Sequence, residues 1–167
     1  MINSFDPIID SNCKVLILGT MPGVKSLQKQ EYYGYERNAF WKIIYSLFDQ
    51  ELSNDYSAKK AFLIKHNIAL WDVLKSCHRE GSSDSNIKNS VPNDIDKLLR
   101  DYPNIKAVFF NGETAKKLFY GFISKNLKST NISYITLPST SPANTKKIEE
   151  KLDKWKEILL LLNASGN

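Results

Sequence analysis

Two polar loops carry the residues whose types and spacing could do chemistry. The first is Gly19-Thr20-Met21-Pro22-Gly23, a glycine-rich turn after an apolar run. The second, far downstream, is Pro138-Ser139-Thr140-Ser141-Pro142-Ala143-Asn144. Glycines allow a tight turn whose backbone N–H groups face a ligand, and serine and threonine hydroxyls can donate to phosphates. Each loop alone could be an ordinary turn, but together they suit a pocket for a flat polar ring beside a phosphate backbone.

Three further positions could contact such a ring. Tyr33 and its aromatic neighbours could be surface residues or a platform on which a base stacks. Asn38 can cap the helix that follows it, and a helix N-terminus at a pocket can also hold an anion or a water. Asn111 ends an apolar run, where its amide could merely close the turn. The same amide offers a donor and an acceptor that suit a lactam edge, as in uracil or hypoxanthine.

Titratable residues show no nucleophilic triad and no metal-ligand spacing. We expect His66 to cap the end of a helix, and His78 lies in a polar region after Cys77. Asp72 and Asp84 are reserve acids that could take part directly in a reaction. The alternative for each is a structural role. A small nucleotide hydrolase would need a metal-binding cluster of acids, and none is evident. We therefore expect no metal and no cofactor.

The composition favours an intracellular protein whose partner is negatively charged. The 167 residues fit one domain over 1–167, with 23 basic and 18 acidic residues, a net charge of +5 and a pI near 9.1. This balance favours nucleic acid, although the lysines between Lys146 and Lys156 alternate with glutamates as on a solvated helix face. Cys13 and Cys77 are too few for a metal site or a disulfide framework. The polar segment Met1 to Asp10 is no signal peptide, and no apolar run could span a bilayer.

The elements that must position these residues alternate between strands and helices. Apolar runs predict four buried parallel strands, at Lys14 to Gly19, Ile68 to Trp71, Ile105 to Phe110 and Ile132 to Leu137. Helices are expected over Ala39 to Phe48, Tyr56 to His66, from Pro92 through Leu99, Glu113 to Ile123 and Thr145 to Leu162. Glu80 to Asn89 reads as a loop that is mobile or lines a site. The pattern predicts a three-layer α/β/α sandwich around a four-stranded parallel sheet, with the post-strand loops at one ligand-binding edge.

In combination, these segments resemble the uracil-DNA glycosylase superfamily. Four motifs carry the resemblance in order along nearly the whole chain: G-T-M-P-G, Y-Y-G-x-x-x-N-x-F-W, F-F-N-G and S-T-S-P-A-N. The match is closer to the hypoxanthine (deoxyinosine) DNA glycosylase branch than to the mismatch-specific uracil glycosylases. The resemblance implies hydrolysis of the N-glycosidic bond of a deaminated base in double-stranded DNA. A non-catalytic DNA- or nucleotide-binding module of the same fold is the alternative.

The resemblance also implies a role for each motif. Tyr33 matches the aromatic that stacks on the flipped base, Asn111 the base-reading amide, and Asn38 the group that positions water. Gly19 lies at the base, and the backbone near Thr20 and Met21 would stabilise charge on the departing base. The DNA backbone would be contacted by both loops, through Pro22, Gly23, Ser139, Thr140, Ser141, Pro142, Ala143 and Asn144.

Two departures from the superfamily pattern bear on the branch to which the chain is similar. Met21 stands where many members carry Asp or Asn, and Thr140 and Ser141 occupy the place of a histidine. Both features fit the hypoxanthine branch and argue against strong uracil excision, while the two cysteines exclude the iron–sulfur branches. We expect a monomer that does not contact membranes, is cytoplasmic, and is associated with the nucleoid when it is bound to DNA.

Overall fold

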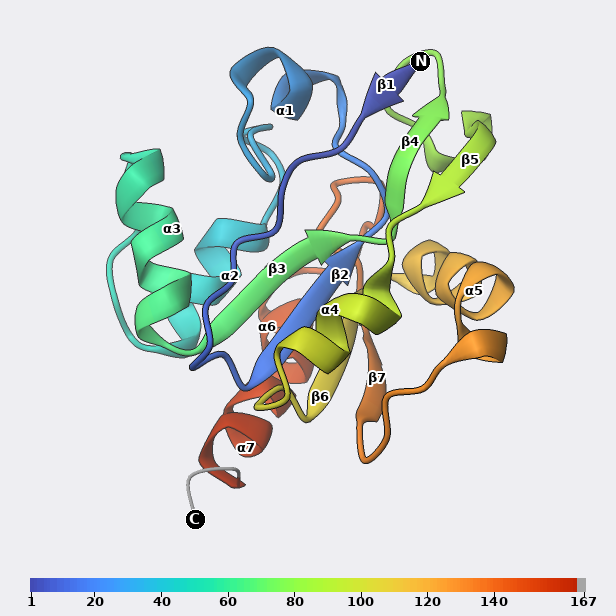
Figure 1. Cartoon of the computed structure of the whole chain (residues 1–167). Coiled ribbons are helices and arrows are strands. Elements are labelled where there is room, and N and C mark those ends of the chain that lie inside the picture. The colour runs from blue at the N-terminus through green and yellow to red at the C-terminus, as the bar shows by residue number, and fades with distance from the viewer. Residues whose placement is uncertain (165–167) are drawn as a thin grey trace.

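A parallel four-stranded sheet forms the centre of the protein (Figure 1). The computed structural model describes residues 1–164, so the last three residues of the expected domain lie outside it. The strand order is β3-β2-β6-β7, and every neighbouring pair is parallel. The strands are β2 (Val15–Gly19), β3 (Ile68–Asp72), β6 (Ala107–Asn111) and β7 (Ser133–Leu137). The predicted three-layer α/β/α architecture with four parallel strands is confirmed.

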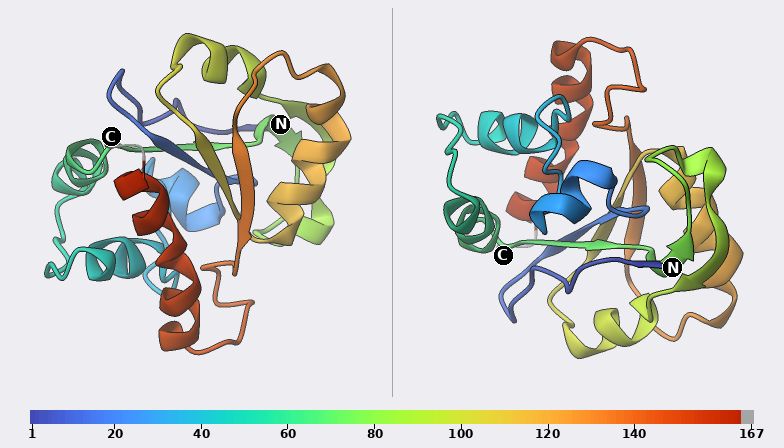
Figure 2. Two further views of the ribbon diagram at one scale, coloured as in Figure 1. Left: turned by 90° about the horizontal axis from the view of Figure 1, so that it is seen from below. Right: turned by 90° about the horizontal axis from the view of Figure 1, so that it is seen from above.

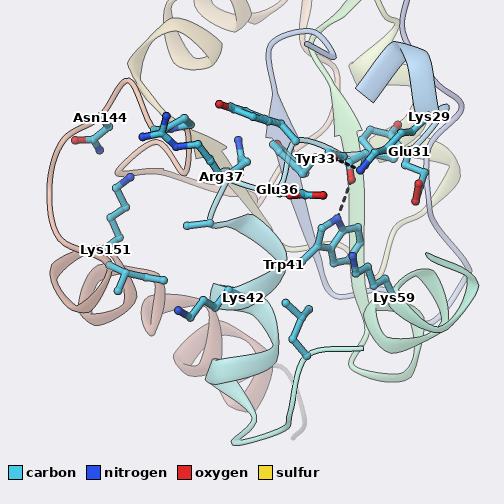
Figure 3. A pocket seen from close by; sticks show the side chains of 18 of the residues that line it. Lys29, Glu31, Tyr33, Glu36, Arg37, Trp41, Lys42, Lys59, Asn144 and Lys151 are labelled. Atoms are coloured by element: carbon cyan, nitrogen blue, oxygen red, sulfur yellow. Dashed lines mark hydrogen bonds between the residues drawn. The ribbon is translucent and has the colours of Figure 1, made fainter. Parts of the chain in front are cut away.

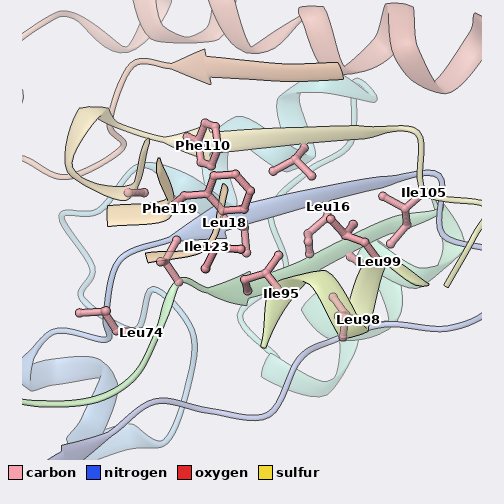
Figure 4. Packing of buried hydrophobic residues seen from close by; sticks show 14 of the residues in the cluster. Leu16, Leu18, Leu74, Ile95, Leu98, Leu99, Ile105, Phe110, Phe119 and Ile123 are labelled. Atoms are coloured by element: carbon pink, nitrogen blue, oxygen red, sulfur yellow. The ribbon is translucent and has the colours of Figure 1, made fainter. Parts of the chain in front are cut away.

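Helices cover both faces of the sheet (Figure 2). Each face buries alternate strand residues against its own helices. Leu16 and Leu18 pack into one cluster with residues of α4 (Ile95–Asp101) and α5 (Glu113–Phe122), as Figure 4 shows. Val15 and Ile17 pack on the opposite face. The helices there are α2 (Phe40–Leu47), α3 (Tyr56–Lys65), α6 (Ile148–Trp155) and α7 (Glu157–Ala164). Because both faces are covered, the strands are continuously apolar.

A second, antiparallel sheet was not predicted. It consists of β1 (Ile2–Asn3), β4 (Leu74–His78) and β5 (Lys88–Pro92), in the order β1-β4-β5. The loop expected over Glu80 to Asn89 is therefore shorter than predicted, because β5 begins at Lys88 and a 3-10 turn, η1 (Asp84–Asn86), interrupts the rest. The short helix α1 (Val24–Lys29) and the turn η2 (Ser124–Asn126) were also missed.

Three helix predictions need correction at their ends. The helix expected from Pro92 begins only at Ile95, with Asp94 as its N-cap, because Pro92 is the last residue of β5. The helix expected over Thr145 to Leu162 begins only at Ile148 and is divided into α6 and α7 at Lys156, where the Leu159 N–H donates to the Lys156 carbonyl at 3.0 Å. Helix α2 begins at Phe40, with Ala39 rather than Asn38 at the N-cap position. Asn38 still supports this end, because its Oδ1 accepts a hydrogen bond from the Phe40 N–H at 3.0 Å.

The strand order places a switch point between β2 and β6. From β2 the chain adds β3 on one side and then crosses back to add β6 and β7 on the other side. Ligands of open parallel sheets bind at the carboxyl ends of the strands beside such a point. Gly19 and Asn111 end the two strands that flank it, and Asp72 ends β3. No helix within residues 1–164 is long and apolar enough to cross a membrane.

Candidate active site

Asn111 is the centre of a hydrogen-bonded cluster at the switch point. Its Nδ2 donates to the Tyr33 hydroxyl and to Thr140 Oγ1, both at 3.0 Å. Its Oδ1 accepts from the Thr140 backbone N–H at 2.9 Å. The structure therefore brings three residues from distant segments together, as the sequence predicted. Both amide protons are already used, so a base can bond Nδ2 only by displacing one of these partners.

Tyr33 enters this cluster from the segment before α2. Its backbone has a φ of 52°, in the left-handed region that residues other than glycine rarely adopt. Its ring stacks on Phe40, with centroids 4.1 Å apart and planes at 19°. Its hydroxyl comes so close to Gly19 that a Cβ there would lie only 2.7 Å from it. Burial raises the pKa of the Tyr33 phenol, so the neutral hydroxyl remains at the sheet edge.

Asp72 also lies against Gly19, and its carboxyl has an unsatisfied buried oxygen. The residue is 4% exposed, and its Oδ2 is buried without a hydrogen-bond partner within residues 1–164. A Cβ at Gly19 would lie 2.6 Å from its Oδ1. Burial raises the pKa of Asp72 to about 7, and the charge of Asp84 adds to the rise while Arg79 opposes it. A carboxyl with this pKa can be a hydrogen-bond donor near neutral pH.

The first loop is buried at its start and clamped by a segment that the sequence did not connect to it. Thr20 and Met21 are 8% and 9% exposed, and the Met21 N–H donates to no group among residues 1–164. Arg79 Nη2 donates to the Pro22 carbonyl at 2.6 Å. The Val24 N–H donates to Ser82 Oγ at 2.9 Å. The polar segment after β4 thus fixes this loop, and Arg79 was a missed site residue.

The second loop is held by its own hydroxyls. Ser139 Oγ accepts from the Ser141 N–H, and Ser141 Oγ accepts from the Ala143 N–H, both at 3.2 Å. Each hydroxyl keeps its own proton for donation to a phosphate. Thr140 differs from the prediction, because its side chain is fully buried against Asn111 and cannot reach DNA in this conformation. Its carbonyl accepts from the Ala39 N–H at 3.0 Å, which joins the loop to α2.

Asn38 lies in a groove beside this cluster rather than in the cluster itself. The groove has a volume of about 840 Å³ and is lined by Tyr33, Asn38, Pro142 and Asn144, among others (Figure 3). Gly19, Thr20, Met21 and Asn111 do not line it. Its charged lining residues are mostly basic: Lys29, Arg37, Lys42, Lys59, Lys146 and Lys151, against Glu31 and Glu36. The groove therefore presents positive charge at the approach to the site.

Other titratable groups show no second site of this kind. No group of three or more His, Cys, Asp or Glu within residues 1–164 could hold a metal ion. Cys13 and Cys77 are free and buried, and burial raises the pKa of each thiol, to about 11 for Cys13. His66 follows the last residue of α3 as its C-cap, as predicted. Asp84 lies in the exposed turn η1.

At its switch point the parallel sheet carries an acid with a raised pKa, an amide and a phenol, beside a basic groove, and this arrangement suits a polar ring held next to a phosphate backbone. Residues 7–163 match the family model described as the uracil DNA glycosylase superfamily. The chain belongs to this superfamily and is therefore a DNA glycosylase by class, a hydrolase of N-glycosyl bonds.

Individual relatives agree with this family. The chain is 34% identical over 154 residues to a hypoxanthine DNA glycosylase of Methanosarcina barkeri, covering 92% of this chain and 94% of that protein. It is 34% identical over 155 residues to a hypoxanthine DNA glycosylase of Methanosarcina acetivorans, covering 92% and 95%. A solution NMR structure of a uracil DNA glycosylase candidate from Methanosarcina acetivorans has a TM-score of 0.79 and 31% identity, covering 96% and 98%.

Proposed function

We propose that the protein removes hypoxanthine from double-stranded DNA by hydrolysing the bond between the base and C1′, and that uracil is a weaker substrate. The observation that carries this proposal is that Asp72 and Tyr33 meet at Gly19 beside the switch point, where the Tyr33 hydroxyl accepts a hydrogen bond from Asn111. The names of the two Methanosarcina relatives support hypoxanthine as the base. Residues 1–167 would act as one domain and as a monomer.

Base recognition would use Asn111, which ends β6, and the ring of Tyr33. An extruded base entering beside Tyr33 would take the place of the phenolic hydroxyl on Asn111 Nδ2, so that a base carbonyl accepts the freed proton. The Tyr33 ring would then stack on the base while it keeps its contact with Phe40. Thr140 holds the amide in orientation throughout, because it bonds both Oδ1 and Nδ2. Extrusion costs a few kcal/mol, and less at a mismatch.

Bond cleavage would rest on stabilising the departing base. Protonated Asp72 would donate a hydrogen bond to a carbonyl or ring nitrogen of the base as negative charge develops there. The unpaired Met21 N–H could donate to the same charge. One well-placed donor of this kind contributes roughly 3 kcal/mol. Because the sugar develops oxocarbenium character, the water needs orientation more than deprotonation. Asn38 would orient it through the lone pair of Oδ1 that Phe40 leaves available.

Excision can be measured directly on synthetic duplexes. Purified protein in excess is incubated with duplexes containing deoxyinosine, deoxyuridine or only normal bases, and alkali then breaks the strand at any abasic site. We expect breaks at deoxyinosine, fewer at deoxyuridine and none in normal DNA. Asn38→Ala should lose most of the activity with its fold intact. The matched control is Asn12→Ala, at the far edge of the protein beside Lys14 and Lys106, which should cleave normally.

Two outcomes would contradict the proposal. Tight binding to lesion DNA without any product would identify a binding module in place of an enzyme. Normal cleavage by Asn38→Ala would remove Asn38 from the mechanism.

A further inference from the structure

Lys151 departs from the prediction of a solvated lysine face on the last helices. It is 4% exposed, whereas Lys147, Lys154 and Lys156 are all exposed. Lysine is almost never buried to this degree without a partner of opposite charge. A buried lysine on an otherwise solvated helix therefore needs a specific explanation.

No acidic group accounts for the burial of Lys151. Its Nζ donates one hydrogen bond, to the Ser141 carbonyl at 3.2 Å, and no carboxylate within residues 1–164 lies close enough for an ion pair. An ammonium has three protons, so two remain for other acceptors. Burial lowers the pKa of Lys151, the direction expected for an ammonium with no carboxylate beside it.

The position of Lys151 indicates where that compensation would come from. The side chain lines the basic groove and extends from α6 toward the loop that carries Asn144 (Figure 3). Arg37, Lys42 and Lys146 line the same groove. The Ser141 carbonyl that receives the Lys151 proton belongs to the second loop, whose Thr140 bonds Asn111. An anion bound at Lys151 would thus be connected to Asn111, the proposed base-reading amide, through the second loop.

We propose that Lys151, with Asn144 and Lys146 beside it, binds a phosphodiester group of the DNA strand that carries the extruded nucleotide. This inference rests on the proposed DNA substrate. A phosphate supplies several strong acceptor oxygens, and hydrogen bonds between an ammonium and a phosphate are among the stronger ones in proteins. The Ser141 bond fixes the ammonium, so less side-chain freedom is lost when the phosphate binds. The second loop then reads phosphate on one side and supports Asn111 on the other.

A purely structural role makes the opposite prediction for stability. If Lys151 serves only to hold the second loop through Ser141, its replacement by methionine should lower the melting temperature. If it is an uncompensated charge kept for a ligand, an apolar side chain of similar length should leave the melting temperature unchanged or raise it, because replacing buried charge by apolar groups is often stabilising.

The experiment compares Lys151→Met with Lys154→Met, an exposed lysine on the same helix. Fluorescence anisotropy with a lesion-free duplex gives the affinity at several salt concentrations. We expect Lys151→Met to weaken binding about tenfold, to lower the slope of log affinity against log salt by about one, and to keep or raise the melting temperature. Lys154→Met should match the wild type. Lys151→Arg, which keeps the charge, should recover part of the affinity.

Each other result overturns the phosphate site. An unchanged salt slope in Lys151→Met, or a lower melting temperature with unchanged affinity, leaves only the structural role. If inorganic phosphate raises the melting temperature of the wild type while duplex DNA binds both proteins equally, the site takes a free anion. Because binding is measured without cleavage, a protein that excises no base can still confirm the phosphate site, and an active enzyme can still refute it.

Discussion

Asp72 and Asp96 are both buried, but their surroundings are opposite. Asp96, near the start of α4, accepts hydrogen bonds from the Lys128 N–H, from the N–H and hydroxyl of Ser129, and from Arg100 Nε. Burial would raise the pKa of Asp96, but these bonds outweigh it and hold the pKa at about 2. The carboxyl of Asp72 has a buried oxygen, Oδ2, with no hydrogen-bond partner within residues 1–164, and burial raises its pKa to about 7.

The difference separates an acid that is bonded within the chain from the acid that we propose to act in the reaction. Asp96 joins α4 to the segment that follows η2, and these bonds are all made within the chain. Ionised Asp72 would destabilise the fold, because no hydrogen bond within residues 1–164 compensates the burial of its Oδ2. It nevertheless lies beside Gly19 and Tyr33. An unpartnered carboxyl oxygen at the ligand edge is best explained by a ligand that partners it.

The largest expected effect is on stability, and it should fall on Asp96 alone. Asp96→Asn should lose about 3 kcal/mol of unfolding free energy, because a buried, charge-assisted network loses its acceptor. Asp72→Asn should be neutral or stabilising, since the Asp72 Oδ2 has no hydrogen bond to lose within residues 1–164. Urea denaturation of both variants at neutral pH measures the two values. Equal losses of unfolding free energy in the two variants would contradict the contrast between Asp72 and Asp96.

The second effect is the pH dependence of stability, which should have opposite sign at the two acids. The pKa of Asp96 is lowered, so its contribution of about 2 kcal/mol is present above the unfolded pKa of 3.8 and is lost as pH falls toward about 2. The pKa of Asp72 is raised, so the folded protein binds the extra proton and stability decreases as pH rises from 3.8 toward about 7. Denaturation of each Asn variant across its pH window should show that the corresponding slope of unfolding free energy against pH is lost. A wild-type slope in either variant would assign it to another group.

The third effect tests the close approach at Gly19. A methyl group at Gly19 would meet Asp72 Oδ1 at 2.6 Å and the Tyr33 hydroxyl at 2.7 Å, so one of them must shift. We expect Gly19→Ala to slow single-turnover excision about tenfold, equivalent to about 1.4 kcal/mol. Gly121→Ala, where a Cβ meets nothing within 4 Å, is the matched control and should excise normally. Normal excision by Gly19→Ala would show that this geometry does not matter to the reaction.

The smallest effect concerns the hydroxyl of Tyr33. Tyr33→Phe leaves one Asn111 proton without its partner and should cost about 1 kcal/mol of stability. Excision should stay within a few-fold of wild type, because the base displaces the hydroxyl and the stacking ring remains. Thermal unfolding and the alkali assay check both values. A large loss of excision would mean that the hydroxyl itself takes part in the reaction.

The elements with long apolar segments were predictable from the sequence, but the short strands that depend on pairing with distant segments were not. The strand ending at Gly19 and helix α2 follow from runs and periodicities that bury a whole face. Strand β4 was missed because Leu74–His78 is a short segment of mixed polar and apolar residues. Pairing with β1 and β5 stabilises it.

The candidate site shows the same division. The meeting of Tyr33 and Asn111 followed from topology, since both segments belong to one sheet edge. The burial of Thr140 and Lys151 depends on how the second loop packs on α6, which residue types alone do not reveal. Sequence singled out Asp72 only as a reserve acid, because the missing partner of its Oδ2 within residues 1–164 can be recognised only in three dimensions.

The most direct test is the rate of hypoxanthine excision from a deoxyinosine duplex, measured under single-turnover conditions from about pH 5 to about pH 9. Wild type, Asp72→Asn and Asp96→Asn are compared at a temperature where all three are folded. The rate of wild type and of Asp96→Asn should fall as pH rises through about 7, the pKa of Asp72. Asp72→Asn should be about 100-fold slower and independent of pH in this range. An Asp72→Asn enzyme with the rate and pH profile of wild type would contradict the account.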